Sequence, residues 1–210
     1  MPTSATPESV NGQITPPAID YSRYFWQAGK VRLRPLRIED AEQGFIHSFD
    51  SPARQTLQLG IELPTSLELA RASLERLVGC KDADGVIVFA IENLAGELVG
   101  GISLHSRDEK NGLFSFGIII YREHRKKGYA QDAVRILLKY GFWERRYQKC
   151  DSACAHDNAG SIALHKGLGF VEEGRRRRAL FCNGVFYDEI LFGMTREEFD
   201  ERAKEWWGAG

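Results

Sequence analysis

The sequence predicts a single domain with a mixed α/β fold. Segments with the apolar spacing of helices alternate along the chain with short apolar segments that are typical of strands. Three of the predicted strands follow one another with short polar turns between them, which indicates an antiparallel meander within a larger mixed sheet. At 210 residues and 43% hydrophobic content, the chain is long enough to bury one sizeable core.

The N-terminal residues differ in composition from the rest of the chain. Residues 1–20 are rich in Pro, Thr, Ser and Ala and have few apolar side chains to bury, so we expect a flexible arm there. The folded domain is expected to span residues 21–210. Near its start, four aromatic residues are expected to pack on the core rather than form a binding site: Tyr21, Tyr24, Phe25 and Trp26.

A strand and two helices are expected to open the domain. The strand is predicted over residues 31–37 and the first helix over residues 40–49. The second helix has a start signal, because Thr65 is followed three residues later by Glu68, and such a pair forms a capping box. Apolar residues at helical spacing follow, at Leu67, Leu74 and Leu77.

The meander is predicted from strands over residues 86–92, 97–105 and 113–120. Turn-forming residues separate them, over residues 93–96 and 108–112. Because these connections are short, consecutive strands should lie side by side and run antiparallel.

The second half of the chain is expected to alternate between helices and strands. A long amphipathic helix is predicted over residues 128–144 from the spacing of its apolar residues. A capping box of Thr195 and Glu198 predicts a C-terminal helix that packs on the domain. Between them we expect a strand over 149–155, a short helix over 161–166, and hairpin strands over 170–181 and 185–192.

Composition argues against several classes of function. The 28 basic and 29 acidic residues give a net charge of -1, which provides no general attraction to nucleic acid or to membranes. No long apolar span or secretory signal is present, so we expect a cytoplasmic protein, or a nuclear one. The cysteines lack the spacing of a zinc or redox motif, so we expect no metal, and reduced, buried thiols at Cys80, Cys150, Cys154 and Cys182.

The segment before the long helix has the layout of a phosphate-binding turn. An apolar strand runs into a basic loop that ends at Gly128 and then opens a helix. The first N–H groups of a helix have no intrahelical partner, so an anion is stabilised at that end. Gly128 lets the backbone approach a phosphate, and Arg125, Lys126 and Lys127 add positive charge. The spacing is neither that of a Walker loop nor that of a dinucleotide fingerprint.

This loop resembles the hallmark of the GNAT superfamily of acyl-CoA-dependent N-acyltransferases. That hallmark is Gln/Arg-x-x-Gly-x-Gly/Ala between the fourth strand and the following helix, and it is matched here by Arg125, Gly128 and Ala130. A second motif of the superfamily is Asn-x-x-Ala/Ser, then a short helix and Leu-Gly-Phe. It is matched by Asn158, Ser161 and residues 168–170.

The resemblance covers roughly residues 30–199. The C-terminal part, over residues 181–199, looks like the branch that contains ribosomal-protein N-terminal acetyltransferases and diamine acetyltransferases. The resemblance implies a single domain whose central sheet splays apart between two parallel strands and is flanked by helices.

In that fold the splayed gap admits the pantetheine arm of acetyl-CoA, which pairs with the earlier strand as an added strand would. The resemblance therefore implies acetyl-CoA as the acetyl donor, CoA as a product and no metal. Backbone groups of Ile118 and Ile120 would bind the pantetheine amides. Backbone N–H groups of the loop would bind the pyrophosphate, in Arg125, Lys126, Lys127, Gly128, Tyr129 and Ala130.

Asn158 is implied to hydrogen-bond the pantetheine arm, with Ser161 beside it. The alternative is that Asn158 caps the short helix and that Ser161 is an ordinary helical residue, because Asn is a preferred N-cap. Capping and ligand contact need not exclude each other.

Acetyl transfer to an amine needs a group that takes the amine proton, donors for the tetrahedral oxyanion and a partner for the leaving thiolate. His165 occupies the position where many GNAT enzymes have a tyrosine that protonates the thiolate; the alternative is that it lines the cleft without transferring a proton. Ser115 stands where the resembling branch often has a glutamate, and a serine is a poor base. Asp188, Glu189 and His105 are the substitutes that we consider, acting through water, although each is also expected as a solvated or structural residue.

Four consecutive arginines occupy residues 175–178. They are compatible with a nucleic-acid or CoA-phosphate patch, but alternate residues of a strand point to opposite faces, so they cannot all serve one surface. We favour a solvated strand edge that discourages aggregation.

Two functions follow from these observations. The favoured one is an acetyl-CoA-dependent N-acetyltransferase that acts on a primary amine of a protein N-terminus, a polyamine or a small molecule. The alternative is a catalytically weak protein that binds acetyl-CoA as a sensor, which the serine at Ser115 suggests. We expect no nucleic-acid or membrane partner, and a monomer or homodimer.

Overall fold

The computed structural model describes residues 19–52, 55, 63–78 and 85–208. Most of the expected N-terminal arm, residues 1–18, and also Cys80 lie outside the described residues. The strands in chain order are β1 (Gln27–Ala28), β2 (Val31–Arg34), β3 (Ile87–Asn93), β4 (Leu98–Asp108), β5 (Leu113–Ile120), β6 (Lys149–Ala155), β7 (Val171–Cys182) and β8 (Val185–Thr195). They form one sheet of eight strands in the order β1-β2-β3-β4-β5-β6-β8-β7, in which β5 and β6 are parallel and every other pair is antiparallel.

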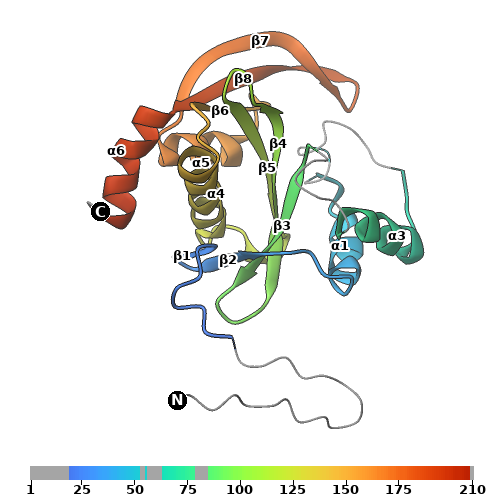
Figure 1. Cartoon of the computed structure of the whole chain (residues 1–210). Coiled ribbons are helices and arrows are strands. Elements are labelled where there is room, and N and C mark those ends of the chain that lie inside the picture. Colours follow the sequence, from blue (N-terminus) through green and yellow to red (C-terminus); the bar gives the residue numbers. More distant parts are fainter. Residues whose placement is uncertain (1–18, 53–54, 56–62, 79–84, 209–210) are drawn as a thin grey trace, which may run out of the picture.

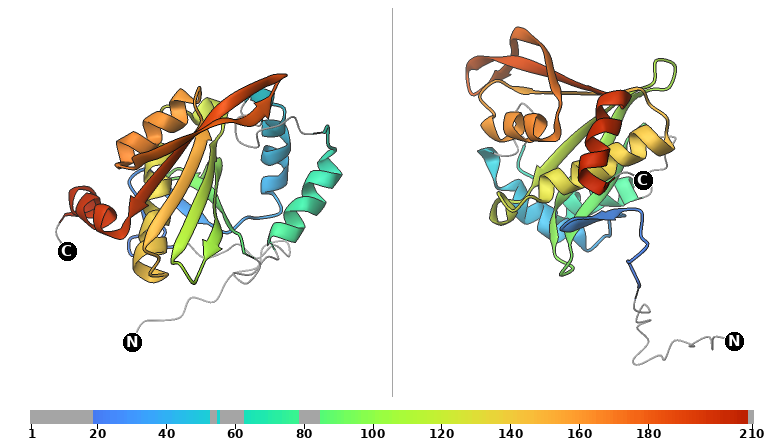
Figure 2. Two further views of the ribbon diagram at one scale, coloured as in Figure 1. Left: turned by 90° about the horizontal axis from the view of Figure 1, so that it is seen from above. Right: turned by 90° about the vertical axis from the view of Figure 1, so that its left-hand side faces the viewer.

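Helices cover both faces of this sheet (Figure 1). One face carries α1 (Asp40–Ser48) and α3 (Leu67–Val78). The opposite face carries α4 (Tyr129–Lys139), α5 (Ala159–Leu168) and α6 (Arg196–Trp207), as the view from above shows (Figure 2). The predicted mixed α/β fold in one domain is confirmed.

The strand β2 and the helix α3 begin or end differently from the predictions. β2 ends at Arg34 rather than at residue 37, because Pro35 has no N–H to donate to the ladder. α3 begins at Leu67, and the Oγ of Ser66 accepts the N–H of Leu69 at 3.2 Å. Ser66 is therefore the N-cap, and the predicted capping box of Thr65 and Glu68 is wrong.

The strands β3, β4 and β5 form the predicted antiparallel meander. Near the end of β4 the pairing with β5 slips between His105 and Asp108, and Ser106 there has a φ of 50°. Irregularities of this kind redirect a side chain at the edge of a ladder. Here the slip contains Ser106 and Arg107, directly after His105.

The second half also follows the predicted order. The helix predicted over residues 128–144 consists of α4 and a π-helical turn, Tyr140–Glu144. The β7–β8 hairpin turns at Asn183 and Gly184, with φ values of 50° and 77°, which are left-handed as a two-residue hairpin turn requires. The predicted capping box of α6 is confirmed, because the N–H of Glu198 donates to Thr195 Oγ1 and the N–H of Thr195 donates to Glu198 Oε2.

Aromatic rings fill the core between the sheet and the helices α4 and α6. The ring of Phe142 lies 5.3 Å from that of Phe114 on β5 and 4.8 Å from that of Phe199 on α6, centroid to centroid. Trp26 packs against this core through Phe89, at 4.8 Å, as predicted for the aromatic cluster before the first strand. This packing fixes α4 against β5 and so fixes the start of α4 at the end of that strand.

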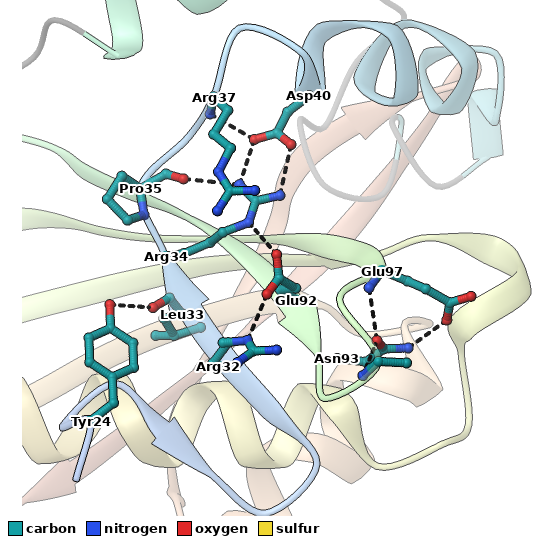
Figure 3. Close-up of polar contacts among 11 residues, drawn as sticks. Tyr24, Arg32, Leu33, Arg34, Pro35, Arg37, Asp40, Glu92, Asn93 and Glu97 are labelled. Atoms are coloured by element: carbon teal, nitrogen blue, oxygen red, sulfur yellow. Dashed lines mark hydrogen bonds and ion pairs between the residues drawn. The ribbon is translucent and has the colours of Figure 1, made fainter. Parts of the chain in front are cut away.

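A buried ionic network joins β2 and β3 to the first turn of α1 (Figure 3). The carboxylate of Glu92 accepts hydrogen bonds from Arg32 Nε at 2.6 Å and from Arg34 Nε at 2.7 Å. Arg34 also donates two hydrogen bonds of 2.8 Å to Asp40. Burial alone would raise the pKa of Asp40, but the hydrogen bonds from Arg34 and from the Arg37 N–H outweigh it and hold this pKa below its usual value. The network therefore anchors α1 to the sheet.

Candidate active site

The site begins where β5 and β6 separate. The two strands pair over three residues each, from Leu113 opposite Lys149 to Ser115 opposite Asp151. Beyond that point both strands continue, β5 to Ile120 and β6 to Ala155, without pairing with each other. This is the splay that the resemblance implies. A cavity of about 1340 Å³ opens between the separated strands.

The cavity brings together residues from four segments that are distant in the sequence. Its lining includes the proposed acetyl-CoA ligands Ile118, Ile120, Arg125, Lys126, Gly128, Tyr129, Ala130, Asn158 and Ser161, and the proposed catalytic residues His165 and Glu189. His105 and Ser115 line it as well. Lys127 and Asp188 are not among its lining residues.

The backbone of β5 presents hydrogen-bonding groups to the cavity. The N–H of Tyr121 donates to the carbonyl of Val99 on the neighbouring β4 at 3.0 Å. Successive residues of a strand turn their N–H and C=O groups to opposite sides, so Ile118 and Ile120 turn theirs away from β4. These groups face the side where β6 has separated. The carbonyl of Ile120 accepts a hydrogen bond of 3.0 Å from Arg125 Nε.

The loop after β5 ends in a backbone conformation that suits an anion. Gly128 is the N-cap of α4 and has a φ of 88°, in the left-handed region that favours glycine, and no side chain caps the helix. The first N–H groups of α4 therefore point out of the helix end without a partner from a capping side chain. Lys126, with a φ of 61°, is also left-handed. Successive N–H groups in such a turn form a concave anion site.

Contacts from other elements hold this loop in place. Lys30, in the turn between β1 and β2, donates from Nζ to the carbonyl of Lys127 at 3.0 Å, and its N–H donates to Asp132 Oδ2 on α4 at 2.9 Å. Arg125 Nη2 donates to Asp50 Oδ2, just after α1, at 2.8 Å. The guanidinium of Arg125 therefore braces the loop against α1, while the side chain of Lys126 lines the cavity.

Asn158 is the N-cap of α5. Its Oδ1 accepts the N–H of Ser161 at 3.0 Å, so the capping role that the sequence offered as an alternative is present. The cap uses only the carbonyl oxygen of the side-chain amide. Because Asn158 also lines the cavity, its Nδ2 is left as a donor on the cavity wall.

Both ring nitrogens of His165 are engaged. Nδ1 lies 2.7 Å from the carbonyl oxygen of Ser161, which only accepts, so Nδ1 carries the hydrogen. Nε2 lies 2.8 Å from Ser152 Oγ and accepts the hydroxyl hydrogen in the neutral ring. The imidazole is 2% exposed and stacks on Phe192 with centroids 4.6 Å apart. Burial lowers the pKa of His165, although the hydrogen bond to Ser161 opposes the shift, so the ring is neutral at neutral pH.

The two carboxylates of β8 have different surroundings. Asp188 accepts the N–H of Arg178 at 2.8 Å and lies 3.3 Å from Arg175 Nε, so it joins β8 to β7. Glu189 is 8% exposed and lines the cavity. Arg176 forms an ion pair with Glu189 and balances its charge. The geometry of this contact is not that of a hydrogen bond to Glu189 Oε2. The arginines lie on β7, the edge strand of the sheet, and are exposed, as expected for a solvated edge.

Some residues of the site carry no recognisable signal in the sequence. Ser152 on β6 forms a hydrogen bond with His165. Lys30 and Asp50, from distant parts of the chain, form hydrogen bonds that hold the phosphate loop in place. None belongs to a motif, because their positions depend on how the sheet assembles. Within the ranges that the structure describes, no three His, Cys, Asp or Glu side chains are grouped to hold a metal ion. The described helices include none that is long and apolar enough to cross a bilayer.

Comparisons with known proteins agree with this geometry. The GNAT acetyltransferase domain family matches residues 30–171. Over 178 residues the chain is 33% identical to the SPbeta prophage-derived uncharacterized N-acetyltransferase YokL of Bacillus subtilis, which covers 84% of this chain and 96% of that protein. It is 28% identical over 175 residues to the spermidine N(1)-acetyltransferase of Escherichia coli, covering 82% of this chain and 89% of the relative.

A solved structure has the same fold. Spermidine N-acetyltransferase from Vibrio cholerae, in complex with CoA and spermine, superposes with a TM-score of 0.70 at 22% identity, over 81% of this chain and 98% of that one. The family match, the splayed strands and the glycine-capped loop agree with one another. The chain belongs to the GNAT family and is an acetyl-CoA-dependent N-acetyltransferase.

Proposed function

We propose that acetyl-CoA binds between β5 and β6, with its pyrophosphate at the start of α4 and its thioester near the point where the strands separate. The observation that carries this proposal is the pairing of two features at opposite ends of one cavity. At one end Gly128 opens α4 in a left-handed conformation, and at the other Ser115 and Asp151 form the last β5–β6 pair. A strand spans about 3.4 Å per residue, so the distance from Ile120 to Ser115 is about 17 Å, which suits an extended pantetheine arm.

Within this arrangement the backbone of β5 is the proposed partner of the pantetheine amides. Ile118 offers both its N–H and its C=O, and Ile120 offers its N–H, because its carbonyl accepts from Arg125. Asn158 Nδ2 is proposed to donate a hydrogen bond to the pantetheine arm from the opposite wall of the cavity. Ser161 is proposed to lie beside the arm, as the Asn158 cap orients it.

The loop is proposed to hold the pyrophosphate with its backbone. The N–H groups of residues 126–130 form the anion site, because the N–H of Arg125 donates to the carbonyl of Arg122. The helix dipole of α4 and the charge of Lys126 reinforce it. Two further contacts fix the shape of the loop. Arg125 donates to Asp50, and the carbonyl of Lys127 accepts from Lys30.

His165 is proposed as a positioning residue. The neutral ring has its only N–H committed to the Ser161 carbonyl, so it offers no donor to a sulfur atom. It holds Ser152 on the cavity wall instead. We therefore propose that the Ser152 hydroxyl, whose one hydrogen lies toward His165 Nε2, turns that hydrogen to the thiolate as sulfur departs.

The acceptor is proposed to be a primary amine of a polyamine, a protein N-terminus or a small molecule. Spermidine is named as the substrate of the relative from Escherichia coli, which makes polyamines the first acceptors to test. The carboxylates of Asp151, Glu173 and Glu189 line the same cavity, where Lys149 and Arg176 pair with them. The cytoplasmic location and the monomeric or homodimeric state stay predictions.

Thiol release from acetyl-CoA, followed with a thiol reagent, tests this function. A panel of spermidine, small diamines, amino acids and short peptides with free N-termini would be added one at a time. We expect at least one amine to accelerate thiol release and to yield an acetylated product by mass spectrometry. If acetyl-CoA binds but no amine raises thiol release above the buffer rate, the sensor function replaces the enzymatic one for this chain.

A further inference from the structure

His105 lies opposite Ser115 on the neighbouring strand. It is near the end of β4, and its Cα is the direct cross-strand partner of Ser115 on β5. The side chains of a cross-strand pair point to the same face of the sheet, and both residues line the cavity. Ser115 donates its hydroxyl hydrogen to the Asp151 carbonyl at 2.6 Å, and a neutral hydroxyl is a poor base. His105 is the titratable side chain opposite Ser115 on β4, and Asp151, opposite Ser115 on β6, pairs with Lys149.

The imidazole of His105 leans along β5 toward Gly117. A β-carbon placed on Gly117 would lie 3.5 Å from His105 Nε2 and 3.2 Å from Ser103 Oγ. Nε2 therefore sits over the backbone of β5 just beyond the point where the strands separate. Because Gly117 has no side chain, nothing from that residue stands between the ring and the cavity.

A second contact orients the ring. Nδ1 of His105 lies 3.0 Å from the Oγ of Ser106. Ser106 has a φ of 50° where the β4–β5 pairing slips, a backbone conformation that non-glycine residues seldom adopt. A hydroxyl accepts as well as donates, so Ser106 can take the Nδ1 hydrogen and leave the lone pair on Nε2.

The ring of His105 is poised as a base. Burial lowers its pKa, and the shift is opposed because the protonated ring, which carries a hydrogen on both nitrogens, can donate to the Phe116 carbonyl. The ring is therefore neutral at neutral pH, and a captured proton finds a hydrogen-bond acceptor in the Phe116 backbone. The carboxylates that line the same cavity are paired, Asp151 and Glu173 with Lys149 and Glu189 with Arg176. Of the other charged lining residues, Arg125 pairs with Asp50, and Lys126 lies in the phosphate loop.

We propose that His105 is the general base of the acetyl transfer, an inference that rests on the proposed function. The amine nitrogen bonds to the thioester carbonyl carbon, and His105 Nε2 takes the proton that the nitrogen loses. The carbon–sulfur bond breaks, and sulfur leaves with the bonding electrons as a thiolate beside Ser152. His105 then returns its proton to solvent or to the thiolate, so that the net products are the acetylated amine and CoA.

This assignment explains how the chain manages without a carboxylate at Ser115. The other candidates are placed less well, since Asp188 bonds to Arg178 away from the cavity and Glu189 is neutralised by Arg176. A histidine on β4 that reaches across to Gly117 supplies a base on the same face. Ser106 is then a positioning residue that acts through His105.

Chemical rescue tests the inference. Positioned general bases contribute roughly 100-fold to 10,000-fold, so His105→Ala should lower kcat by about 100-fold or more while the Kd for acetyl-CoA, measured by calorimetry, stays within about threefold. Added imidazole should restore part of the lost rate in His105→Ala, and less basic imidazoles should restore less. His156→Gln is the matched control, because His156 packs on Tyr187 and is not a lining residue of the cavity.

A titration of the folded protein gives a readout that does not depend on turnover. Histidine ring resonances in the NMR spectrum should include one that is missing in His105→Gln and that titrates below the usual value of about 6.5. The inference is overturned if His105→Ala keeps wild-type kcat, or if its loss of rate resists every imidazole while acetyl-CoA still binds. If instead the unmodified protein fails to bind acetyl-CoA, the proposed function itself is wrong.

Discussion

The hydroxyl of Ser115 donates a hydrogen bond of 2.6 Å to the carbonyl oxygen of Asp151, at the last pair of the β5–β6 ladder. This bond ties the two strands together at the point beyond which they separate. It therefore sets where the cavity begins. It also commits the Ser115 hydrogen, so that the residue at the position of the missing carboxylate is structural.

Replacing Ser115 tests this role. Ser115→Ala removes the donor and leaves the Asp151 carbonyl without it, which should lower the free energy of unfolding by about 1 to 3 kcal/mol in urea denaturation. Ser115→Thr keeps the hydroxyl and should stay closer to the wild type. The pH dependence of kcat/KM should be the same in all three proteins, and a shift of its acidic limb in Ser115→Ala would show that Ser115 takes part in proton transfer.

The buried network around Arg34 should dominate the stability of the N-terminal half. Asp40→Asn removes one of the two carboxylates that pair with the buried Arg34 guanidinium, while Glu92 remains, so it should cost about 1.5 to 3 kcal/mol. A loss below about 1 kcal/mol in urea denaturation would mean that water replaces the pair. Glu42→Gln is the matched control, because Glu42 pairs with Arg71 on an exposed helix surface, where such pairs contribute about 0 to 1 kcal/mol.

The same network predicts how stability depends on pH. The pKa of Asp40 is lower in the folded protein than its usual value of 3.8. The ionised Asp40 carboxylate therefore contributes fully to the free energy of unfolding when the pH is above the pKa of Asp40 in the unfolded chain. This contribution is lost as the pH falls through the lower pKa of the folded protein. Stability measured between pH 2 and pH 6 should decrease less steeply with acid in Asp40→Asn than in the wild type. Equal slopes would contradict this assignment.

Ser152 and His165 should act on the leaving thiol rather than on affinity. In the complex with CoA, the bound thiol should titrate at higher pH in Ser152→Ala than in the wild type, as followed by thiolate absorbance. Ser152→Thr keeps the hydroxyl and should preserve the wild-type value. His165→Asn should resemble Ser152→Ala, because it removes the acceptor that holds the hydroxyl. An unchanged thiol pKa in both Ser152→Ala and His165→Asn would remove Ser152 from the mechanism.

The parts of the structure that could be predicted from the sequence are those encoded locally. Gly128 before an amphipathic segment indicates a glycine-capped helix, and the pair Thr195 and Glu198 indicates a capping box, because both depend only on nearby backbone groups. Turn residues likewise indicated the meander. The start of α3 shows the limit of such signals, since Thr65 and Ser66 are both good caps and only the fold decides between them.

The rest depends on contacts between distant segments. Lys30 and Lys127 are 97 residues apart in the sequence, yet a hydrogen bond joins them. His165 matched a motif position, but its partner Ser152 became evident only when β6 and α5 were placed side by side. The side of β5 on which His105 lies follows from the cross-strand register, which a single sequence does not specify.

Calorimetric titration with acetyl-CoA tests the central claim, that the cavity between β5 and β6 binds this donor with its phosphates at the start of α4. We predict micromolar binding or tighter, worth about 8 kcal/mol or more, by the unmodified protein. Gly128→Glu should abolish binding, because the new carboxylate repels the phosphates and the left-handed backbone is strained for a residue with a side chain. The matched control is Gly44→Glu, on the exposed surface of α1, which should leave binding unchanged. The account is contradicted if the unmodified protein does not bind acetyl-CoA, or if a folded Gly128→Glu variant binds it as tightly as the wild type.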